Sequence, residues 1–169
     1  MSHLYYGHGK GKTTAAMGLV LRWVGRGGKA VVAQFLKGVD SGERLVLQKL
    51  PNVTLLPVPE QMPFLWNMTP EEREQAAGTA QNLLQQSCAL TDGATLLVLD
   101  ELCGAEETGL IPEPLAARYL NQLPQGAEVV ITGRNPPEKW LEWADYVTEL
   151  RAQKHPYERG VPARKGIEY

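Results

Sequence analysis

The sequence has few cysteines and no excess of charge of one sign. Only Cys88 and Cys103 occur in 169 residues, which is too few for a disulfide framework, and their spacing fits no zinc motif. We therefore expect two reduced thiols. Lys and Arg number 17 against 19 Asp and Glu, giving a net charge of −2. That balance argues against non-specific nucleic-acid binding, which needs a strongly positive surface.

Long apolar runs are also missing. No stretch approaches the ~20 apolar residues that a membrane helix requires, and the N-terminus MSHLYYGHGKGK has no apolar core of signal-peptide type. We expect a cytoplasmic protein with no membrane partner. Hydrophobic residues make up 43% and charged residues 21%, close to a globular average. The length predicts one domain spanning residues 1–169.

Apolar runs alternate with helical patterns along the chain. Strands are predicted at 3–6, 30–36, 53–58, 95–100, 127–132 and 146–150, and helices at 12–24, 41–50, 69–91, 112–123 and 136–144. In the third helix, Thr69 can cap, Pro70 occupies the first turn and Glu72 completes a capping box. Continuous apolar strands between helices predict an α/β fold whose mostly parallel sheet is covered on both faces. A loop-rich tail follows from residue 151.

The strongest local signal is a glycine-rich loop between the first strand and the first helix. It comprises Gly7, His8, Gly9, Lys10, Gly11, Lys12, Thr13 and Thr14. Glycines permit close approach to an anion, and a helix N-terminus favours negative charge. Lys12 would contact the outer phosphates of a nucleotide, and Thr13 would offer its hydroxyl to Mg²⁺. The loop departs from G-x-x-x-x-G-K-[ST], since Tyr6 stands where that pattern has glycine.

Two other predicted strands end in polar residues. The run 96–101, LLVLDE, places Asp100 and Glu101 at the carboxyl end of a buried strand, and 129–134, VVITGR, places Arg134 at the same edge. Ligands of open α/β sheets bind at this edge. Asp100 or Glu101 could hold Mg²⁺ directly or through water. Together with the glycine loop, these residues predict a P-loop nucleotide site of RecA-like architecture.

Beyond the nucleotide site, the chain resembles the P-loop corrinoid adenosyltransferases. The resemblance rests on GHGKGKTTAA (7–16), VVAQFLKG (31–38) followed by Gly42 and Glu43, LLVLDEL (96–102), VVITGR (129–134), and the tail KHPYERGVPARKGIEY (154–169). The tail is the most family-specific segment, and its basic stretch 151–165 could order over ATP or the corrin. His8 stands where the family often has a small polar residue, so we interpret it as a variable position.

The resemblance implies that a Co(I) corrinoid attacks the 5′ carbon of MgATP and that triphosphate leaves. It implies catalytic roles for Lys12, Thr13 and Glu101, and Mg²⁺ binding by Thr13, Asp100 and Glu101. ATP would be bound by the loop 7–14 with Arg22 and Arg134. Phe64 and Trp66 match a family segment that excludes the lower axial ligand of the corrinoid. The substrate could be cobalamin, cobinamide or cobyrinic acid diamide, and a flavin-type donor and a homodimer are also implied.

Two points stay open at this stage. Many family members have an N-terminal extension over the corrin of the partner subunit, whereas six residues precede Gly7. We expect the corrin site to be more open or to be closed by another segment.

The alternative function is a P-loop ATPase or kinase-like enzyme that does not act on corrinoids. In an ATPase Glu101 would activate water, and a regulator that has lost catalysis is a third possibility.

Overall fold

The computed structural model describes residues 1–38, 41–60 and 67–167. Its strands are β1 (Ser2–Tyr6), β2 (Lys29–Gln34), β3 (Val53–Leu55), β4 (Thr95–Asp100), β5 (Glu128–Gly133) and β6 (Tyr146–Glu149). Its helices are α1 (Lys12–Val24), α2 (Gly42–Leu47), α3 (Pro70–Ala89), α4 (Leu102–Glu107), α5 (Glu113–Leu120) and α6 (Glu138–Trp143). A 3-10 turn, η2 (Pro156–Arg159), lies in the tail. Among the described helices, none is long and apolar enough to cross a bilayer.

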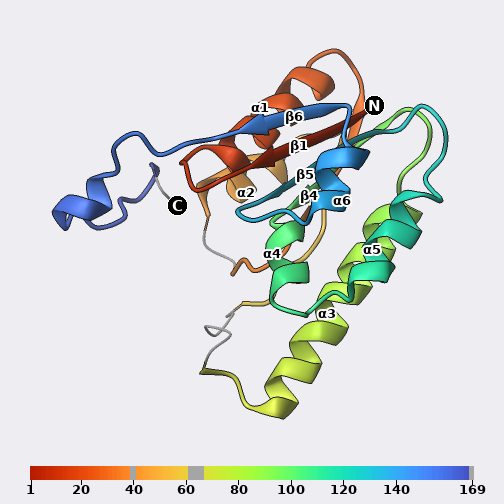
Figure 1. The fold of residues 1–169 in the computed structure, drawn as a ribbon. Coiled ribbons are helices and arrows are strands. Elements are labelled where there is room, and N and C mark those ends of the chain that lie inside the picture. The colour runs from red at the N-terminus through yellow and green to blue at the C-terminus, as the bar shows by residue number, and fades with distance from the viewer. Residues whose placement is uncertain (39–40, 61–66, 168–169) are drawn as a thin grey trace.

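The six strands form one sheet in the order β3-β2-β4-β5-β1-β6. Every paired neighbour is parallel, so the predicted parallel α/β fold is confirmed. One strand, β5, separates β1, which leads into the glycine loop, from β4, which ends at Asp100. All six strands run in the same direction, so their carboxyl ends share one edge of the sheet (Figure 1).

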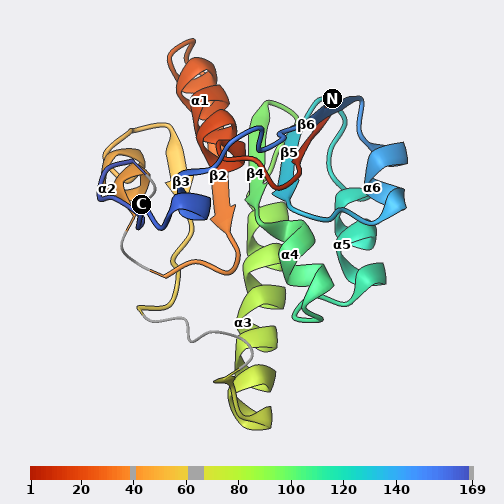
Figure 2. The ribbon, with the colours of Figure 1, turned by 60° about the vertical axis from the view of Figure 1, so that its left-hand side comes forward.

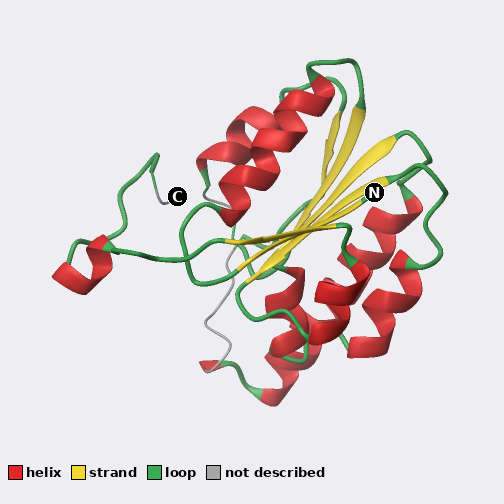
Figure 3. Cartoon of the chain, turned by 45° about the horizontal axis from the view of Figure 1, so that its top comes forward, coloured by secondary structure: helices red, strands yellow, loops and turns green. Residues whose placement is uncertain are grey.

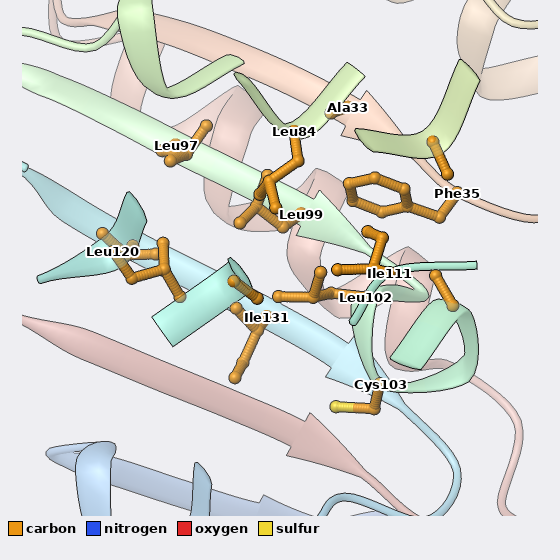
Figure 4. Close-up of a cluster of buried hydrophobic side chains, with 14 of the residues drawn as sticks. Ala33, Phe35, Leu84, Leu97, Leu99, Leu102, Cys103, Ile111, Leu120 and Ile131 are labelled. Carbon is orange, nitrogen blue, oxygen red and sulfur yellow. The ribbon is translucent and has the colours of Figure 1, made fainter. Parts of the chain in front are cut away.

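Helices cover both faces of the sheet (Figure 3). On one face, α1 and α2 bury Ala16, Val20 and Leu47 against Val32 and Val98. On the other face, α3 to α6 cover a larger cluster built around Leu97, Leu99 and Ile131, shown with its neighbours in Figure 4. Trimming one of these fully buried leucines to alanine would cost about 2–5 kcal/mol. The sheet is therefore a rigid platform for whatever is attached to its ends.

Most predicted elements are present with shifts at their ends. The capping box of α3 forms as expected, with the Thr69 hydroxyl accepting from the Glu72 amide and the Glu72 carboxylate accepting from the Thr69 amide. The strand predicted at 30–36 ends instead at Gln34, because Leu36 turns out of the sheet with a φ of 55°. The strand predicted at 53–58 ends at Leu55, and the helix predicted at 41–50 spans only Gly42–Leu47.

Helix α4 is an element that the sequence did not predict. Its six residues, LCGAEE, contain a glycine and are too short to show a helical period. Four of them are buried, and Cys103 packs so closely on β5 that a Cβ at Gly133 would lie 2.3 Å from its Cβ. Tertiary packing rather than local propensity therefore holds α4. The residue before it, Glu101, has a φ of 62°.

The tail leaves the sheet after β6 and extends away from the helices (Figure 1). In the view turned by 60°, η2 lies in front of the sheet (Figure 2), and Figure 1 shows that it stands away from it. The tail starts at the carboxyl end of β6, and its residues His155 and Ile167 line a hollow together with the glycine loop.

Candidate functional site

The glycine loop joins β1 to the first turn of α1 at the carboxyl edge of the sheet. Gly7 and Gly11 have φ values of 105° and 112°, in the left-handed region that favours glycine. Gly9 is constrained in another way. Its amide donates to the Leu150 carbonyl at 2.7 Å, and a Cβ there would lie 2.6 Å from that oxygen. The segment leaving β6 therefore helps to shape the loop.

Lys12 lies inside this loop. Its ammonium donates to the carbonyl of Gly7 at 2.8 Å and to that of Gly9 at 3.2 Å, and the side chain is only 9% exposed. Burial lowers the pKa of Lys12, whereas the nearby carboxylate of Glu101 works in the opposite direction. An ammonium has three N–H donors, and the two carbonyls use two of them. Within the described chain, the loop thus fixes a cation with one donor left for an anion.

Asp100 is the centre of a buried hydrogen-bonded cluster. Its side chain is 1% exposed and accepts hydrogen bonds from three other side chains. Thr13 donates to its two oxygens at 3.0 and 3.1 Å, Thr132 donates to Oδ1 at 2.8 Å, and Gln34 Nε2 donates to Oδ2 at 3.2 Å. We call Thr13, Gln34, Asp100 and Thr132 the Asp100 cluster. It joins α1, β2, β4 and β5 at one point.

Glu101 faces the same space as Lys12. Burial, with help from the Asp100 charge, raises the pKa of Glu101, and the cations of Lys12, Arg134 and Lys37 oppose that rise. The backbone amide of Glu101 donates to the Thr132 hydroxyl at 2.8 Å. The Thr132 hydroxyl therefore donates to the Asp100 carboxylate and accepts from the Glu101 backbone. Glu101 also has a φ of 62°. This left-handed conformation costs a non-glycine residue about 1–3 kcal/mol of folding free energy, and it is typical of functional sites.

Two connected hollows lie at this edge of the sheet. One, of about 220 Å³, is lined by residues 8–14 together with Glu101, Arg134 and the tail residues His155 and Ile167. The other, of about 410 Å³, is lined by residues that include Thr13, Asp100, Glu101 and Arg134. The structure therefore brings Lys12, Thr13, Asp100, Glu101 and Arg134 together.

The other predicted site residues are less closely placed. Arg22 is exposed in the last turn of α1, about 14 Å along the helix from Thr13 at 1.5 Å per residue, so the structure does not bring it to the loop. Lys10 lines the smaller hollow and also a second hollow formed with the tail. His8 is exposed at the smaller hollow and contacts Asn135 Oδ1 at 3.1 Å. Phe64 and Trp66 lie outside the described residues.

Several residues in the site were missed by sequence reasoning. Gln34 and Thr132 are each buried at the end of an apolar strand, and a polar residue in such a position is a signal that could have revealed them. Asn135 Nδ2 donates to the carboxylate of Glu107 at 3.0 Å. Glu107 lines the larger hollow. No local pattern marks Asn135, because its role depends on how the loop after β5 folds.

The donor set fits Mg²⁺ that arrives with a nucleotide. The oxygens of Thr13 and Asp100 are hard ligands of the kind that Mg²⁺ prefers, and Glu101 adds another carboxylate at the same hollow. Across the described residues, no group of three or more His, Cys, Asp or Glu side chains could hold a metal alone. Mg²⁺ needs only one or two protein carboxylates when phosphates and water supply the remaining ligands.

An apolar groove adjoins the larger hollow. It has a volume of about 350 Å³ and runs between the end of β2 and α3, from Glu72 to Leu83. Its wall includes Phe35, Ala76, Ala80, Leu83 and Leu110, with Glu72 and Gln75 also on α3. We call it the α3 groove. It shares Phe35, Leu36 and Lys37 with the hollow that contains Thr13 and Asp100, so an apolar surface meets a charged one.

Comparison with known proteins gives consistent matches along the chain. The corrinoid adenosyltransferase of Escherichia coli K12 is 37% identical over 169 residues, covering 98% of this chain and 84% of the relative. The CobA corrinoid adenosyltransferase of Salmonella typhimurium is 36% identical, covering 98% and 84%, and that of Pseudomonas aeruginosa is 32% identical, covering 98% and 82%. Among solved structures, the Pyrococcus furiosus Hef helicase domain matches 96% of this chain and 37% of its own, with 17% identity and a TM-score of 0.47.

The family model for ATP:corrinoid adenosyltransferases of the BtuR/CobO/CobP type matches residues 1–169. Its match and the identities above cover the loop, the Asp100 cluster, the α3 groove and the tail. The chain belongs to the ATP:corrinoid adenosyltransferase BtuR/CobO/CobP family.

Proposed function

We propose that the protein transfers the 5′-deoxyadenosyl group of MgATP to the cobalt of a Co(I) corrinoid and releases triphosphate. The observation that carries this proposal is the convergence of Lys12, Thr13 and Asp100 at one end of the sheet, in a chain of this family. The reaction is an alkyl transfer. The electron pair of Co(I) forms the cobalt–carbon bond, the C5′–O bond breaks, and its electron pair leaves with the triphosphate.

The nucleotide end would act on the leaving group. Lys12 is held by two carbonyls in a buried position, where a fixed positive charge stabilises developing negative charge better than it would in water. Thr13, Asp100 and Glu101 would hold Mg²⁺, which supplies further charge stabilisation to the phosphates when it is bound. Arg134, at the rim of both hollows, would add a second cation. Because cobalt is the nucleophile, the protein needs no general base.

The α3 groove is our proposed location for one face of the corrinoid. A corrin ring has a large apolar surface, and burial of such a surface is favourable at about 25 cal/mol per Å². The groove opens beside the hollow of Thr13 and Asp100, so a ring there would lie near a nucleotide held by the loop. We propose that Phe64 and Trp66 exclude the lower axial ligand, which makes cobalt easier to reduce.

The remaining features of the proposal come from the family. We propose that the protein works as a homodimer in the cytoplasm and that a flavin-type donor reduces the cobalt. Cobalamin, cobinamide and cobyrinic acid diamide are the candidate substrates. Arg22, which lies away from the loop in one chain, is proposed to bind ATP only on the strength of the resemblance.

Product analysis tests this function. The protein is incubated without oxygen with MgATP and chemically reduced cob(I)alamin, and the visible spectrum and phosphate species are followed. We expect a light-sensitive cobalt–carbon product and one triphosphate for each corrinoid converted. ADP and phosphate with unchanged corrinoid would instead identify an ATPase, and a phosphorylated nucleoside would identify a kinase. Cobinamide and cobyrinic acid diamide, assayed in parallel, identify the preferred substrate.

A further inference from the structure

Arg44 and Gln34 connect helix α2 to the Asp100 cluster. Gln34 is the last residue of β2 and is 1% exposed, and Arg44, on α2, is 9% exposed. Arg44 Nη1 donates to Gln34 Oε1 at 2.9 Å, and Gln34 Nε2 donates to Asp100 Oδ2 at 3.2 Å. A continuous line of two hydrogen bonds therefore runs from the guanidinium to the acid.

The chemistry of these groups allows only one orientation of the amide. A guanidinium donates hydrogen bonds and accepts none, so the oxygen of Gln34 must face Arg44. The amide nitrogen then faces two acceptors, Asp100 at 3.2 Å and Glu43 Oε1 at 3.3 Å. If the amide turned over, its oxygen would face two carboxylates and its NH₂ would face a cation. Arg44 thus determines that Asp100 receives a donor from this side.

Arg44 is itself held in place from a second direction. Its Nη2 donates to the carbonyl of Leu56 at 2.9 Å, just past the end of β3. Glu43, the neighbour of Arg44 on α2, is paired with Lys37. The guanidinium therefore has a fixed position between β2 and β3, which an orienting group requires.

We propose that Arg44 is a positioning residue for Mg²⁺ binding and acts through Gln34 on Asp100. The inference rests on the proposed function, in which Asp100 holds the Mg²⁺ of MgATP. With the amide fixed, Oδ2 of Asp100 has a donor on one side and Oδ1 has Thr132, so the carboxylate plane is set before the nucleotide arrives. Without Arg44 the amide can turn, and the carboxylate loses that restraint.

The first test examines the amide in the metal-free protein. In wild type, the two side-chain NH₂ signals of Gln34 in a nitrogen-correlated NMR spectrum should be shifted from those of a solvent-exposed glutamine and exchange slowly, because both hydrogens are bonded. Arg44→Met should move both signals toward the values of a solvent-exposed glutamine and speed exchange, whereas Arg44→Lys, which keeps a donor, should preserve the shifts in part. Unchanged signals in Arg44→Met would overturn the proposal without reference to any metal.

The second test measures ATP binding by calorimetry as Mg²⁺ is varied. Arg44→Met and Gln34→Met should each raise the Mg²⁺ concentration needed for half-maximal binding about tenfold, the value of one hydrogen bond to a charged group. The double variant should need less than about twofold more Mg²⁺ than either single variant, because both substitutions disrupt the same pair of hydrogen bonds. ATP binding without Mg²⁺ should change little. Additive effects of the two substitutions would overturn the proposal.

Two further variants separate the possible failures. Leu47→Ala removes a buried side chain from the same helix without touching Gln34, so it should lower stability and leave the Mg²⁺ requirement unchanged. If it raises that requirement as much as Arg44→Met does, Arg44 only stabilises α2 and the inference is wrong. Asp100→Asn should abolish the Mg²⁺ dependence. If Asp100→Asn leaves it intact, the proposed metal site itself is wrong.

Discussion

The two halves of the site are held by different forces. At the nucleotide end, Asp100 accepts from three side chains and Lys12 donates to two carbonyls, so direction and charge set each position. In the α3 groove, the wall is mainly aliphatic and aromatic, and α3 contributes more of it than any other element. Hydrogen bonds fix atoms to within tenths of an ångström, whereas apolar contact fixes area and shape. The nucleotide end should therefore tolerate substitution poorly and the groove more readily.

The largest expected effect is the loss of the loop cation. Lys12→Met should reduce kcat for adenosyl transfer about 10²–10³-fold, the usual cost of removing one fixed charge or donor from a developing anion. Lys49→Met, which removes a lysine from an exposed position after α2, is the matched control and should retain wild-type rates. Activity within tenfold of wild type in Lys12→Met would show that this cation does not stabilise the leaving group.

The next effect concerns the ion pair between Lys37 and Glu43, beside Gln34. Burial alone would raise the pKa of Glu43, but the hydrogen bond from Lys37 and other donors outweigh it and lower the pKa to about 2. The Glu43 carboxylate therefore binds a proton more tightly in the unfolded chain than in the folded protein, so protonation favours unfolding. The stabilisation is present above about pH 4.5 and is lost as the pH falls toward 2. Because solvent partly screens this pair, the stabilisation is on the order of 1–3 kcal/mol.

Urea unfolding of wild type and Glu43→Gln between pH 3 and 7 measures that effect. The free-energy difference between the two proteins should be largest near neutral pH and shrink steadily below pH 4.5. A difference that stays constant with pH would contradict the assignment. In that case the Lys37–Glu43 pair contributes packing rather than charge to this end of β2.

Thr132→Val should cost about 1–3 kcal/mol of unfolding free energy. Valine has nearly the same shape, but it leaves the Glu101 amide without its acceptor and Asp100 without one donor, and unpaired buried polar groups cost about this much. Thr148→Val on the exposed edge strand β6 should change stability by less than about 0.5 kcal/mol. Equal stabilities for the two variants would show that the Asp100 cluster is not tightly coupled to the fold.

The smallest effect is expected in the groove. Ala76→Leu would narrow the α3 groove, and overfilling of this kind costs about 1–3 kcal/mol. The KM for cob(I)alamin should rise about tenfold while the KM for ATP changes less than twofold. Asn82→Leu, on an exposed position of the same helix, should leave both constants unchanged. A larger change in the KM for ATP than for the corrinoid would place the groove on the nucleotide side instead.

Much of the nucleotide end could be predicted from the sequence because its signals are local. Glycines at 7 and 11, a lysine and threonine at a helix start, and two acids at a strand end lie within short segments, and the direction of parallel strands brings them together. The α/β fold followed from the alternation of apolar runs and helical patterns. The predictions of roles for these residues remain to be tested by the experiments above.

The parts that could not be predicted depend on distant contacts. Helix α4 is too short for a period and is held by packing on β5. The pairing of Arg44 with Gln34 joins residues on different elements, and no spacing in the sequence reveals it. The requirement for glycine at position 9 was expected from anion binding, but its closest neighbour in the structure is Leu150, 141 positions along the chain.

The contact between Gly9 and Leu150 has a consequence for the order of folding. The amide of Gly9 needs the carbonyl of Leu150, and β1 pairs with β6, so the start of the chain completes its structure only after nearly all of it exists. At ~5–20 residues per second of synthesis, the loop waits roughly 7–28 seconds for Leu150 to be made. The loop is thus translated long before it can mature, and a nascent chain acquires its complete phosphate loop only after β6 has been made.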